Sequence, residues 1–384
     1  MKILYVITST TRGGAENTLH TIISGIDRRR YQPVCAVSLK PLGPVADAIA
    51  KTGVPVKSLN MGFLPSPAHA AQLARLFREY KPDIVHALLF RAIQFSRFAA
   101  RGTGIRLITS PRVNYRTRPK PLQLLDKWAR TENELVICES EATRKYMIEQ
   151  LGYRPDRTGI IRNGVDSEKW AFSPQLREEK RKALGLRESE LFIVTAGRLD
   201  GQKGQRYLIE TLPLLNKRGI SPKIAILGDG PLKQDFLSDI SKNKLDNFVL
   251  LPGEQEDVLP WLCAADIFVL PSLWEGTPNA LMEAMSAGLS CVASGVDGVN
   301  EIAQDGVTAL LVPPADPQAL CNAIERLALN PELRKNLGKA ARSYAGAQLS
   351  TAKMLSAYEA AYEKVSLQTG KTTNYENPSR TTLQ

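Results

Sequence analysis

Short apolar runs alternate with longer amphipathic segments along almost the whole chain, and this alternation constrains the fold more than any other feature. Short runs of branched apolar residues are typical of strands that are buried on both faces. The strand-like runs fall at 3–8, 34–38, 54–59, 82–86, 106–110, 134–138, 191–196, 223–227, 248–251, 266–270, 291–294 and 309–312. Helical segments separate most of them, which predicts an α/β fold of doubly wound parallel sheets with helices on both faces.

The chain is expected to form two Rossmann-like domains that face each other across a cleft. Its 384 residues exceed a typical single core, and the charged stretch 173–190 interrupts the alternation before it restarts. We therefore expect an N-terminal domain at 1–170 and a C-terminal domain at 171–350. Helices are expected at 317–327, 331–347 and 351–365. The polar segment 367–384 lacks apolar periodicity, which predicts a disordered tail.

One strand–helix unit in the second half places two carboxylates around a helix N-terminus. The strand at 266–270 leads into Pro271-Ser-Leu-Trp-Glu-Gly-Thr-Pro-Asn-Ala-Leu-Met-Glu-Ala-Met-Ser-Ala-Gly288. Thr277 suits the N-cap of a helix and Pro278 its first position, while a glycine suits its end. Glu275 then lies just before the helix, and Glu283 lies about two turns along it.

The start of this helix is a candidate anion site. The first backbone N–H groups of a helix have no partner inside the helix, so those of Asn279, Ala280 and Leu281 could bind a phosphate. The two carboxylates beside them would accept hydrogen bonds from hydroxyl groups. The unit favours a ligand with both hydroxyls and phosphate. The alternative is an ordinary strand–helix unit with Glu283 on the solvated face. This stretch alone does not decide between the two interpretations.

Other candidate residues follow expected strands, where open parallel sheets bind ligands. Gly13 and Gly14 follow the first strand without the spacing of a dinucleotide fingerprint, so a tight turn is the alternative. Arg198 and Lys203 lie in a glycine-flanked loop and suit a diphosphate, although either alone would be taken as a solvated charge. His86 ends an expected strand, and a structural role is slightly favoured over a catalytic one.

Signatures of metal and nucleophile chemistry are missing from the sequence. It contains no Asp-x-Asp pair, Walker loop, His/Cys cluster or Gly-x-Ser-x-Gly elbow, which disfavours metal-assisted phosphoryl transfer and serine hydrolysis. We therefore expect no metal and no other cofactor. The five cysteines are scattered without a Cys-x-x-Cys pair, which indicates free thiols in a reducing cytoplasm.

Positive charge is concentrated in the first half. Residues 1–170 hold 27 Lys and Arg against 14 Asp and Glu, whereas residues 171–384 hold 23 against 25. This excess indicates an anionic partner, such as a lipid surface, a diphosphate-bearing substrate or a nucleic acid. No nucleic-acid module is present, so no nucleic-acid partner is expected.

The segment 111–130 is the most basic part of the chain. Its second part can form a helix with Leu122, Leu125 and Trp128 on one face, which is typical both of interfacial membrane helices and of ordinary surface helices. We favour a solvated face that attracts anions, with contact to an anionic membrane as the alternative. No apolar run is long enough to cross a bilayer, and the N-terminus does not look like a signal peptide.

Taken together, these motifs resemble the retaining glycosyltransferases of family four, which have the GT-B fold. The stretch from Glu275 to Glu283 resembles the Glu-x7-Glu motif of that family, and 196–204 resembles its Gly-Arg-Leu…Lys-Gly loop. Further matching segments lie at 13–16, 163–166, 228–230, 265–272 and 305–314. Each motif has modest specificity, but their order and spacing together are specific over roughly residues 2–361.

The resemblance implies a role for each matched residue. Glu275 would contact hydroxyls of the donor sugar, and Glu283 would contact the ribose of the nucleotide. Arg198 and Lys203 would bind the diphosphate. The remaining donor contacts would come from Gly13, Gly14, Glu254, Gly276, Asn279, Ala280 and Leu281, with the loop at Glu254 bordering the base.

The resemblance also implies a reaction. A sugar would pass with retention, and without a metal, from a nucleotide-diphosphate sugar to a hydroxyl of a glycan or lipid-linked acceptor in cell-surface polysaccharide or glycolipid biosynthesis. A UDP-sugar is favoured over a GDP-sugar. Residues 1–170 would bind the acceptor, and a helix at 351–366 would cross back to brace that domain. The expected location is the cytoplasm, with peripheral attachment to the inner membrane face.

One position departs from the family pattern. Relatives often carry His-x-His at the end of the fourth strand, with the second His near the reacting centre, whereas this chain has His86-Ala-Leu88. His86, Asn114 or Arg112 could take over, or no side chain is needed there. We keep His86 with Glu275 as the catalytic candidates. The alternative function is a catalytically weak or inactive nucleotide-sugar-binding subunit of a glycan assembly complex.

Overall fold

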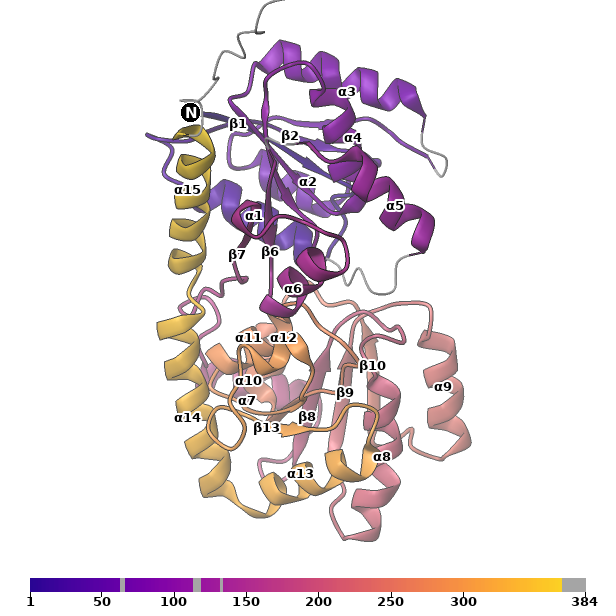
Figure 1. Ribbon diagram of the computed structural model, residues 1–384. Coiled ribbons are helices and arrows are strands. Elements are labelled where there is room, and N and C mark those ends of the chain that lie inside the picture. Colours follow the sequence, from indigo (N-terminus) through magenta and orange to yellow (C-terminus); the bar gives the residue numbers. More distant parts are fainter. Residues whose placement is uncertain (63–65, 113–118, 132–133, 368–384) are drawn as a thin grey trace, which may run out of the picture.

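Two parallel β-sheets, one in each half of the chain, form the framework of the protein (Figure 1). The computed structural model describes residues 1–62, 66–112, 119–131 and 134–367. The first sheet has the order β3-β2-β1-β4-β5-β6-β7. Its strands are β1 (Lys2–Ile7), β2 (Gln32–Ser38), β3 (Val56–Ser58), β4 (Ile84–Leu88), β5 (Arg106–Ser110), β6 (Glu134–Cys138) and β7 (Thr158–Ile160).

The second sheet has the order β10-β9-β8-β11-β12-β13, and its strand pairs are also parallel. Its strands are β8 (Phe192–Ala196), β9 (Lys223–Leu227), β10 (Val249–Gly253), β11 (Ile267–Leu270), β12 (Ser290–Ser294) and β13 (Leu310–Val312). In each sheet the strand order reverses beside the first strand, between β1 and β4 and between β8 and β11. Such reversals create crevices at the carboxyl ends of the strands. The expected fold of two doubly wound α/β domains is confirmed.

Helices cover both sheets because most strands are followed by an amphipathic segment. In the first half they are α1 (Gly14–Gly25), α2 (Pro44–Ala50), α3 (Pro67–Tyr80), α4 (Phe90–Ala100), α5 (Lys120–Ala129) and α6 (Glu141–Glu149). In the second half they are α7 (Pro174–Ala183), α8 (Gln205–Lys217), α9 (Lys233–Lys242), α10 (Leu259–Ala264), α11 (Asn279–Ser286), α12 (Asp297–Asn300), α13 (Pro317–Leu329), α14 (Pro331–Gln348) and α15 (Thr351–Leu367).

Most expected elements lie within two or three residues of the observed ones, but two differences affect the site. The strand expected at 82–86 is β4, Ile84–Leu88, so His86 lies in the middle of a strand rather than at its end. The edge strand β7 was not expected, because three residues carry too little periodicity to register. The tail expected to be disordered lies outside the described residues from 368 onward.

The last helix returns to the first domain and packs against its core (Figure 1). The chain crosses between the domains twice, and the two crossings touch: Val165 N donates to Leu349 O at 2.7 Å, and Thr351 N donates to Val165 O at 3.1 Å. The contact requires Gly164, because a Cβ there would lie 2.6 Å from the Thr351 Cα atom. Beyond this crossing, Tyr358 and other residues of α15 join the apolar core under the first sheet.

His86 belongs to this packing. It is fully buried; its Nδ1 lies 2.9 Å from the Tyr362 hydroxyl on α15, and its Nε2 lies 2.9 Å from the Ser110 hydroxyl on β5. Burial, and secondarily the positive charge of Arg112, lowers the pKa of His86 to about 3. Both ring nitrogens therefore have partners inside the fold, and the ring is neutral at physiological pH.

A buried ionic cluster fixes the orientation of α5. The buried Arg97 of α4 pairs with Asp126 of α5 at 2.9 Å and with Glu134 of β6 at 2.6 Å. Because Asp126 faces inward, the other side of α5 faces solvent, where Leu124 is 64% exposed and Trp128 is 65% exposed. In the part of the chain that the structure describes, no helix combines the length and apolarity needed to span a membrane.

The neutral His86 predicts a loss of stability in acid. Its pKa is about 3 in the fold but about 6.5 in an unfolded chain, so between these values only the unfolded chain binds the proton. The contribution of His86 to the free energy of unfolding is complete above pH 6.5. Below pH 6.5 it falls by about 1.4 kcal/mol per pH unit. From pH 6.5 to 5 we expect the thermal midpoint to fall more steeply in the wild type than in a His86→Gln variant, which does not titrate; parallel profiles would contradict this.

Candidate active site

The loop between β11 and α11 brings the central residues of the site together. The helix begins at Asn279, with Pro278 in the N-cap position and no side-chain cap. The expectation that Thr277 caps the helix is wrong: its hydroxyl donates instead to the main-chain oxygen of Glu139 in the first domain, at 2.6 Å. Pro278 has no side-chain acceptor, so the first N–H groups of α11 remain available for a ligand.

Glu275 and Lys203 form an ion pair beside this helix. Lys203 Nζ lies 2.6 Å from Glu275 Oε1, and the Ser272 hydroxyl donates to the same oxygen at 2.7 Å. The Glu275 side chain is 5% exposed and that of Lys203 is 23% exposed. A buried carboxylate needs such partners, since burying an isolated charge is costly. Both partners bind Oε1. They hold the carboxylate in one orientation and leave Oε2 without a hydrogen bond to either of them.

Close backbone packing at glycines positions the loop that carries Arg198 and Lys203. A Cβ at Gly204, whose φ is +62°, would collide with the Pro271 carbonyl group, and one at Gly228 would collide with that of Gly197. The loop is thereby pressed against the carboxyl ends of β9 and β11. Arg198 itself points into solvent: its side chain is 72% exposed, and its Nε lies 3.7 Å from Asp200 Oδ2.

The first domain reaches the start of α11 at two points. A Cβ at Gly14, the first residue of α1, would lie 3.6 Å from Asn279 Nδ2. Asn163, which follows β7, donates from Nδ2 to Asn279 Oδ1 at 2.8 Å and to the Thr277 carbonyl at 3.1 Å. Its Oδ1 accepts from Thr18 at 3.2 Å and also from Arg112. This network is buried, so it fixes the two domains relative to each other.

Glu283 lies half-buried along α11. Burial raises its pKa to about 7, and the positive charge of Lys169 opposes this only in part. Its carboxyl group forms no hydrogen bond with any residue in the described ranges. Hydroxyl donors of a ligand would stabilise its ionised form.

Three further residues expected to contact the donor, Gly13, Gly276 and Glu254, lie in separate loops. Gly13 precedes α1 in extended conformation, and a Cβ there would collide with the Glu16 carboxylate. Gly276 lies next to Glu275, and a Cβ there would collide with the Glu139 carboxylate. Glu254 follows β10 and is exposed. Near it, Arg12 of the first domain pairs with Glu256 at 2.7 Å across the rim of the cleft.

The structure does not bring His86 into this site. Its ring is enclosed by β5 and α15, and Leu88, which occupies the position of the second His in relatives, is also fully buried. Of the substitutes considered, Arg112 is buried and donates to Asn163 and to the Tyr358 hydroxyl, so it serves the domain interface. Asn114 lies outside the described residues.

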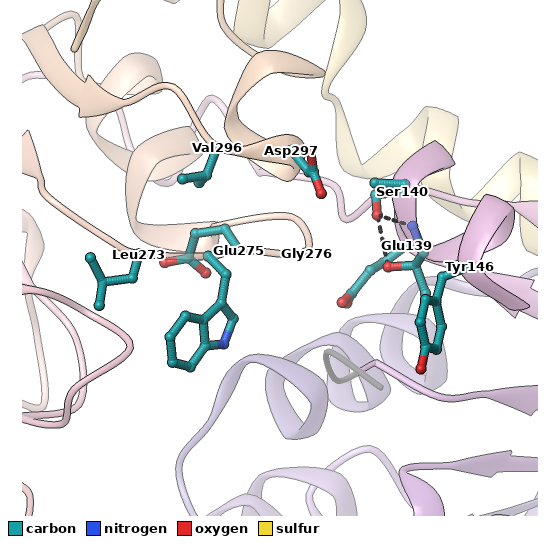
Figure 2. Close-up of a pocket in the computed structure, with 11 residues that line it drawn as sticks. Glu139, Ser140, Tyr146, Leu273, Glu275, Gly276, Val296 and Asp297 are labelled. Atoms are coloured by element: carbon teal, nitrogen blue, oxygen red, sulfur yellow. Dashed lines mark hydrogen bonds between the residues drawn. The ribbon is translucent and has the colours of Figure 1, made fainter. Parts of the chain in front are cut away.

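One site residue was missed from the sequence. Glu139 follows β6 directly and lines a cavity of about 230 Å³ between the domains, together with Glu275 and Gly276 (Figure 2). Burial raises its pKa; Arg112 lowers it and Glu275 raises it further. Its place at the carboxyl end of a strand was a signal that the sequence offered. No cluster of three or more potential metal ligands occurs among the residues that the structure describes.

Comparison with known proteins gives consistent results for both halves of the chain. A family model described as "Glycosyltransferase Family 4" matches residues 12–169, and one described as "Glycosyl transferases group 1" matches residues 190–330. The chain is 30% identical over 302 residues to UDP-Gal:alpha-D-GlcNAc-diphosphoundecaprenol alpha-1,3-galactosyltransferase of Escherichia coli, covering 75% of this chain and 78% of the relative. It is 25% identical over 315 residues to the putative glycosyltransferase EpsF of Bacillus subtilis, covering 80% and 82% of the two chains.

Solved structures share the fold over nearly the whole chain. The structure of Anabaena Alr3699/HepE in complex with UDP-glucose superimposes with a TM-score of 0.85 at 22% identity, covering 95% of this chain and all of that one. A sucrose-phosphate synthase from Thermosynechococcus elongatus gives a TM-score of 0.82 at 17% identity, covering 95% of this chain and 99% of that one.

The ion pair predicts different effects for the two loop cations. Lys203→Met leaves the buried Glu275 charge unpaired, so the free energy of unfolding should fall by about 2 to 3 kcal/mol, less than the about 3 to 5 kcal/mol of a fully buried pair. Arg198→Met, in the same loop but exposed, should change it by less than about 0.5 kcal/mol. Adding Glu275→Gln to Lys203→Met should recover stability. Chemical denaturation measures all four proteins, and equal stability of the two single variants would refute the assignment.

Proposed function

The chain belongs to glycosyltransferase family 4 and has the GT-B fold, and from this premise we propose that it transfers a sugar, with retention and without a metal, from a UDP-sugar to a hydroxyl of a lipid-linked or glycan acceptor. The reaction would serve cell-surface polysaccharide or glycolipid biosynthesis, as the names of relatives such as the amylovoran biosynthesis glycosyltransferase AmsK of Erwinia amylovora suggest.

One observation carries the proposal: the uncapped start of α11, the Lys203–Glu275 pair and the first turn of α1 meet at the cleft. The helix start and Lys203 supply positive potential for a diphosphate. Glu275 supplies an acceptor for sugar hydroxyls, and Glu283 supplies one farther along the same helix. A nucleotide-diphosphate sugar laid along α11 would meet each of these groups.

The proposed step breaks the bond between the anomeric carbon and the diphosphate oxygen and forms one between that carbon and the acceptor oxygen. The acceptor attacks from the face that the diphosphate leaves, so its hydroxyl proton can pass to the departing oxygen and the configuration is retained. The negative charge that accumulates on the diphosphate is stabilised by Lys203, Arg198 and the N–H groups of α11. The cleft also lowers the activation barrier by holding the two substrates in the orientation that the reaction requires.

The choice of a UDP-sugar has support from two relatives. The Escherichia coli relative is named for a UDP-galactose donor, and HepE was solved with UDP and with UDP-glucose. In this chain the nucleotide would lie between Glu283 and the loop after β10, where Glu254 is exposed. Leu88, which stands where relatives often have a second His, was the reason to consider an inactive binding subunit. Because Leu88 is fully buried, it does not distinguish an active transferase from such a subunit.

The acceptor side is proposed to meet the inner membrane face through α5. Its outer face exposes Leu122, Leu124 and Trp128, and Arg101 stacks on the Trp128 ring at 4.7 Å from its centroid. Exposed lysines at both ends of the helix, Lys120 and Lys127, suit anionic headgroups.

The donor site predicts a specific loss of transfer. Glu275→Gln keeps the side-chain shape but removes the charge that pairs with Lys203, so release of UDP from UDP-glucose or UDP-galactose in the presence of bacterial membranes should fall at least about 100-fold, as expected from losing about 3 kcal/mol of transition-state stabilisation. Glu188→Gln, an exposed ion-pair residue of the second domain, is the control and should retain activity.

A thermal-shift series accompanies this assay. A UDP-sugar at a hundred times its dissociation constant should stabilise the wild type by about 2.7 kcal/mol, and a GDP-sugar should not. Donor binding without turnover in the wild type would favour the binding-subunit alternative. Full activity of Glu275→Gln would refute the proposed role of the pair.

The membrane surface is tested separately. Replacing both Leu124 and Trp128 by Ser should weaken co-sedimentation with phosphatidylglycerol vesicles about 10-fold or more, because it removes apolar area that would enter the interface. Leu237→Ser/Val307→Ser changes two exposed apolar residues of the second domain and should have no effect. Equal losses in both pairs, or binding that ignores added salt, would contradict docking through α5.

A further inference from the structure

A cavity of about 230 Å³ lies between the start of α6 and the loops that follow β11 and β12 (Figure 2). Its volume is below the about 300–1,000 Å³ of sites that hold whole drug-sized ligands, so it would take one part of a larger substrate. Carboxylates of both domains line it, Glu139 from the first domain and Glu275 from the second, and Trp274 supplies an aromatic wall.

Glu139 is the unusual member of this lining. The residue is only 8% exposed, yet its carboxylate forms no hydrogen bond or ion pair with any residue of the described ranges. In Figure 2 it points across the cavity toward Glu275 and Gly276. The missing side chain of Gly276 is what admits it, because a Cβ there would collide with Glu139 Oε1. A buried carboxylate without a partner costs stability, so the fold bears a cost here that a ligand would offset.

We propose that this cavity is a subsite for one sugar ring and that Glu139 selects the hydroxyl groups of that ring. The inference rests on the proposed function. Hydroxyl groups are the donors that two facing carboxylates accept, and Glu275 Oε2 is available because Lys203 and Ser272 both bind Oε1. The face of Trp274 suits the apolar side of a pyranose ring. The ring belongs either to the donor sugar or to the acceptor sugar, since both would approach Glu275.

The burial of Glu139 also predicts the sign of a stability change. Burial raises the pKa of its carboxyl group, so the fold disfavours its ionised form. A residue kept for packing would destabilise the protein when replaced. A residue kept for a ligand, at a cost to the fold, should leave the stability of the free protein unchanged or increase it.

The experiment compares Glu139→Gln and Glu139→Leu with the wild type and with Glu141→Gln, an exposed carboxylate two residues later on α6. Calorimetry measures the affinities for UDP, UDP-glucose and UDP-galactose, a UDP-release assay with bacterial membranes measures the acceptor dependence, and thermal melts measure stability. We expect both Glu139 variants to melt at or above the wild-type midpoint and Glu141→Gln to match the wild type throughout.

The two sources of the ring separate in these measurements. A donor ring predicts that affinity for the UDP-hexose falls about 10- to 100-fold in Glu139→Leu, as for loss of a hydrogen bond to a charged group, while affinity for UDP is unchanged. An acceptor ring predicts unchanged donor affinity and a similar rise in the KM for the membrane acceptor. If neither quantity changes more than twofold in Glu139→Leu, or if both variants melt lower and lose UDP affinity equally, the subsite proposal is wrong. A wild type that binds no nucleotide would instead overturn the proposed function.

Discussion

The buried amide of Asn163 is the contact on which the geometry of the cleft depends. Its Nδ2 donates to the Thr277 carbonyl and to Asn279 Oδ1 at the start of α11. Its Oδ1 accepts from Thr18 on α1 and from Arg112 after β5. Every hydrogen-bonding position of this one side chain is thus engaged, on both sides of the domain boundary. An unsatisfied buried amide is costly, so the network favours one relative placement of the domains. The anion site at α11 and the first turn of α1 face each other because of it.

Like many binding sites, this site has charges that are only partly compensated within the protein. Lys203 neutralises Glu275, but Glu283 and Glu139 are carboxyl groups whose pKa values are raised by burial. Clustered raised values at a cleft are typical of functional sites, because they mark groups whose partners arrive with the substrate. A nucleotide sugar carries hydroxyl groups, the hydrogen-bond donors that these carboxyl groups lack within the protein.

Local patterns predicted the elements better than the contacts between them. The loops at Gly14, Lys203 and Glu275 could be placed at the carboxyl edges of the two sheets because branched apolar runs mark parallel strands and their ends. Glu139 could have been noticed at the carboxyl end of its strand, but its contact with Gly276, a residue of the other domain, could not be predicted from the sequence. His86 was placed at a strand end because the strand was expected at 82–86; the strand continues to Leu88, and α15 supplies the partner that buries the histidine. Thr277 looked like a helix cap, but a carbonyl of the first domain competes for its hydroxyl. These differences arise from tertiary contacts that no window of sequence contains.

The paired crossings at Val165 and Leu349 have a mechanical consequence. Since the two connecting segments are hydrogen-bonded to each other, they act as a single pivot rather than as two independent tethers. Any relative motion of the domains that broke the Asn163 contacts would then be a rotation about this point, with displacements that increase with distance from it. β10 lies on the opposite side of the second domain from α14 (Figure 1), and Glu256 in the loop after it pairs with Arg12 of the first domain. Such a rotation would separate Arg12 from Glu256 on the far side of the cleft more than it would separate the segments beside the crossing.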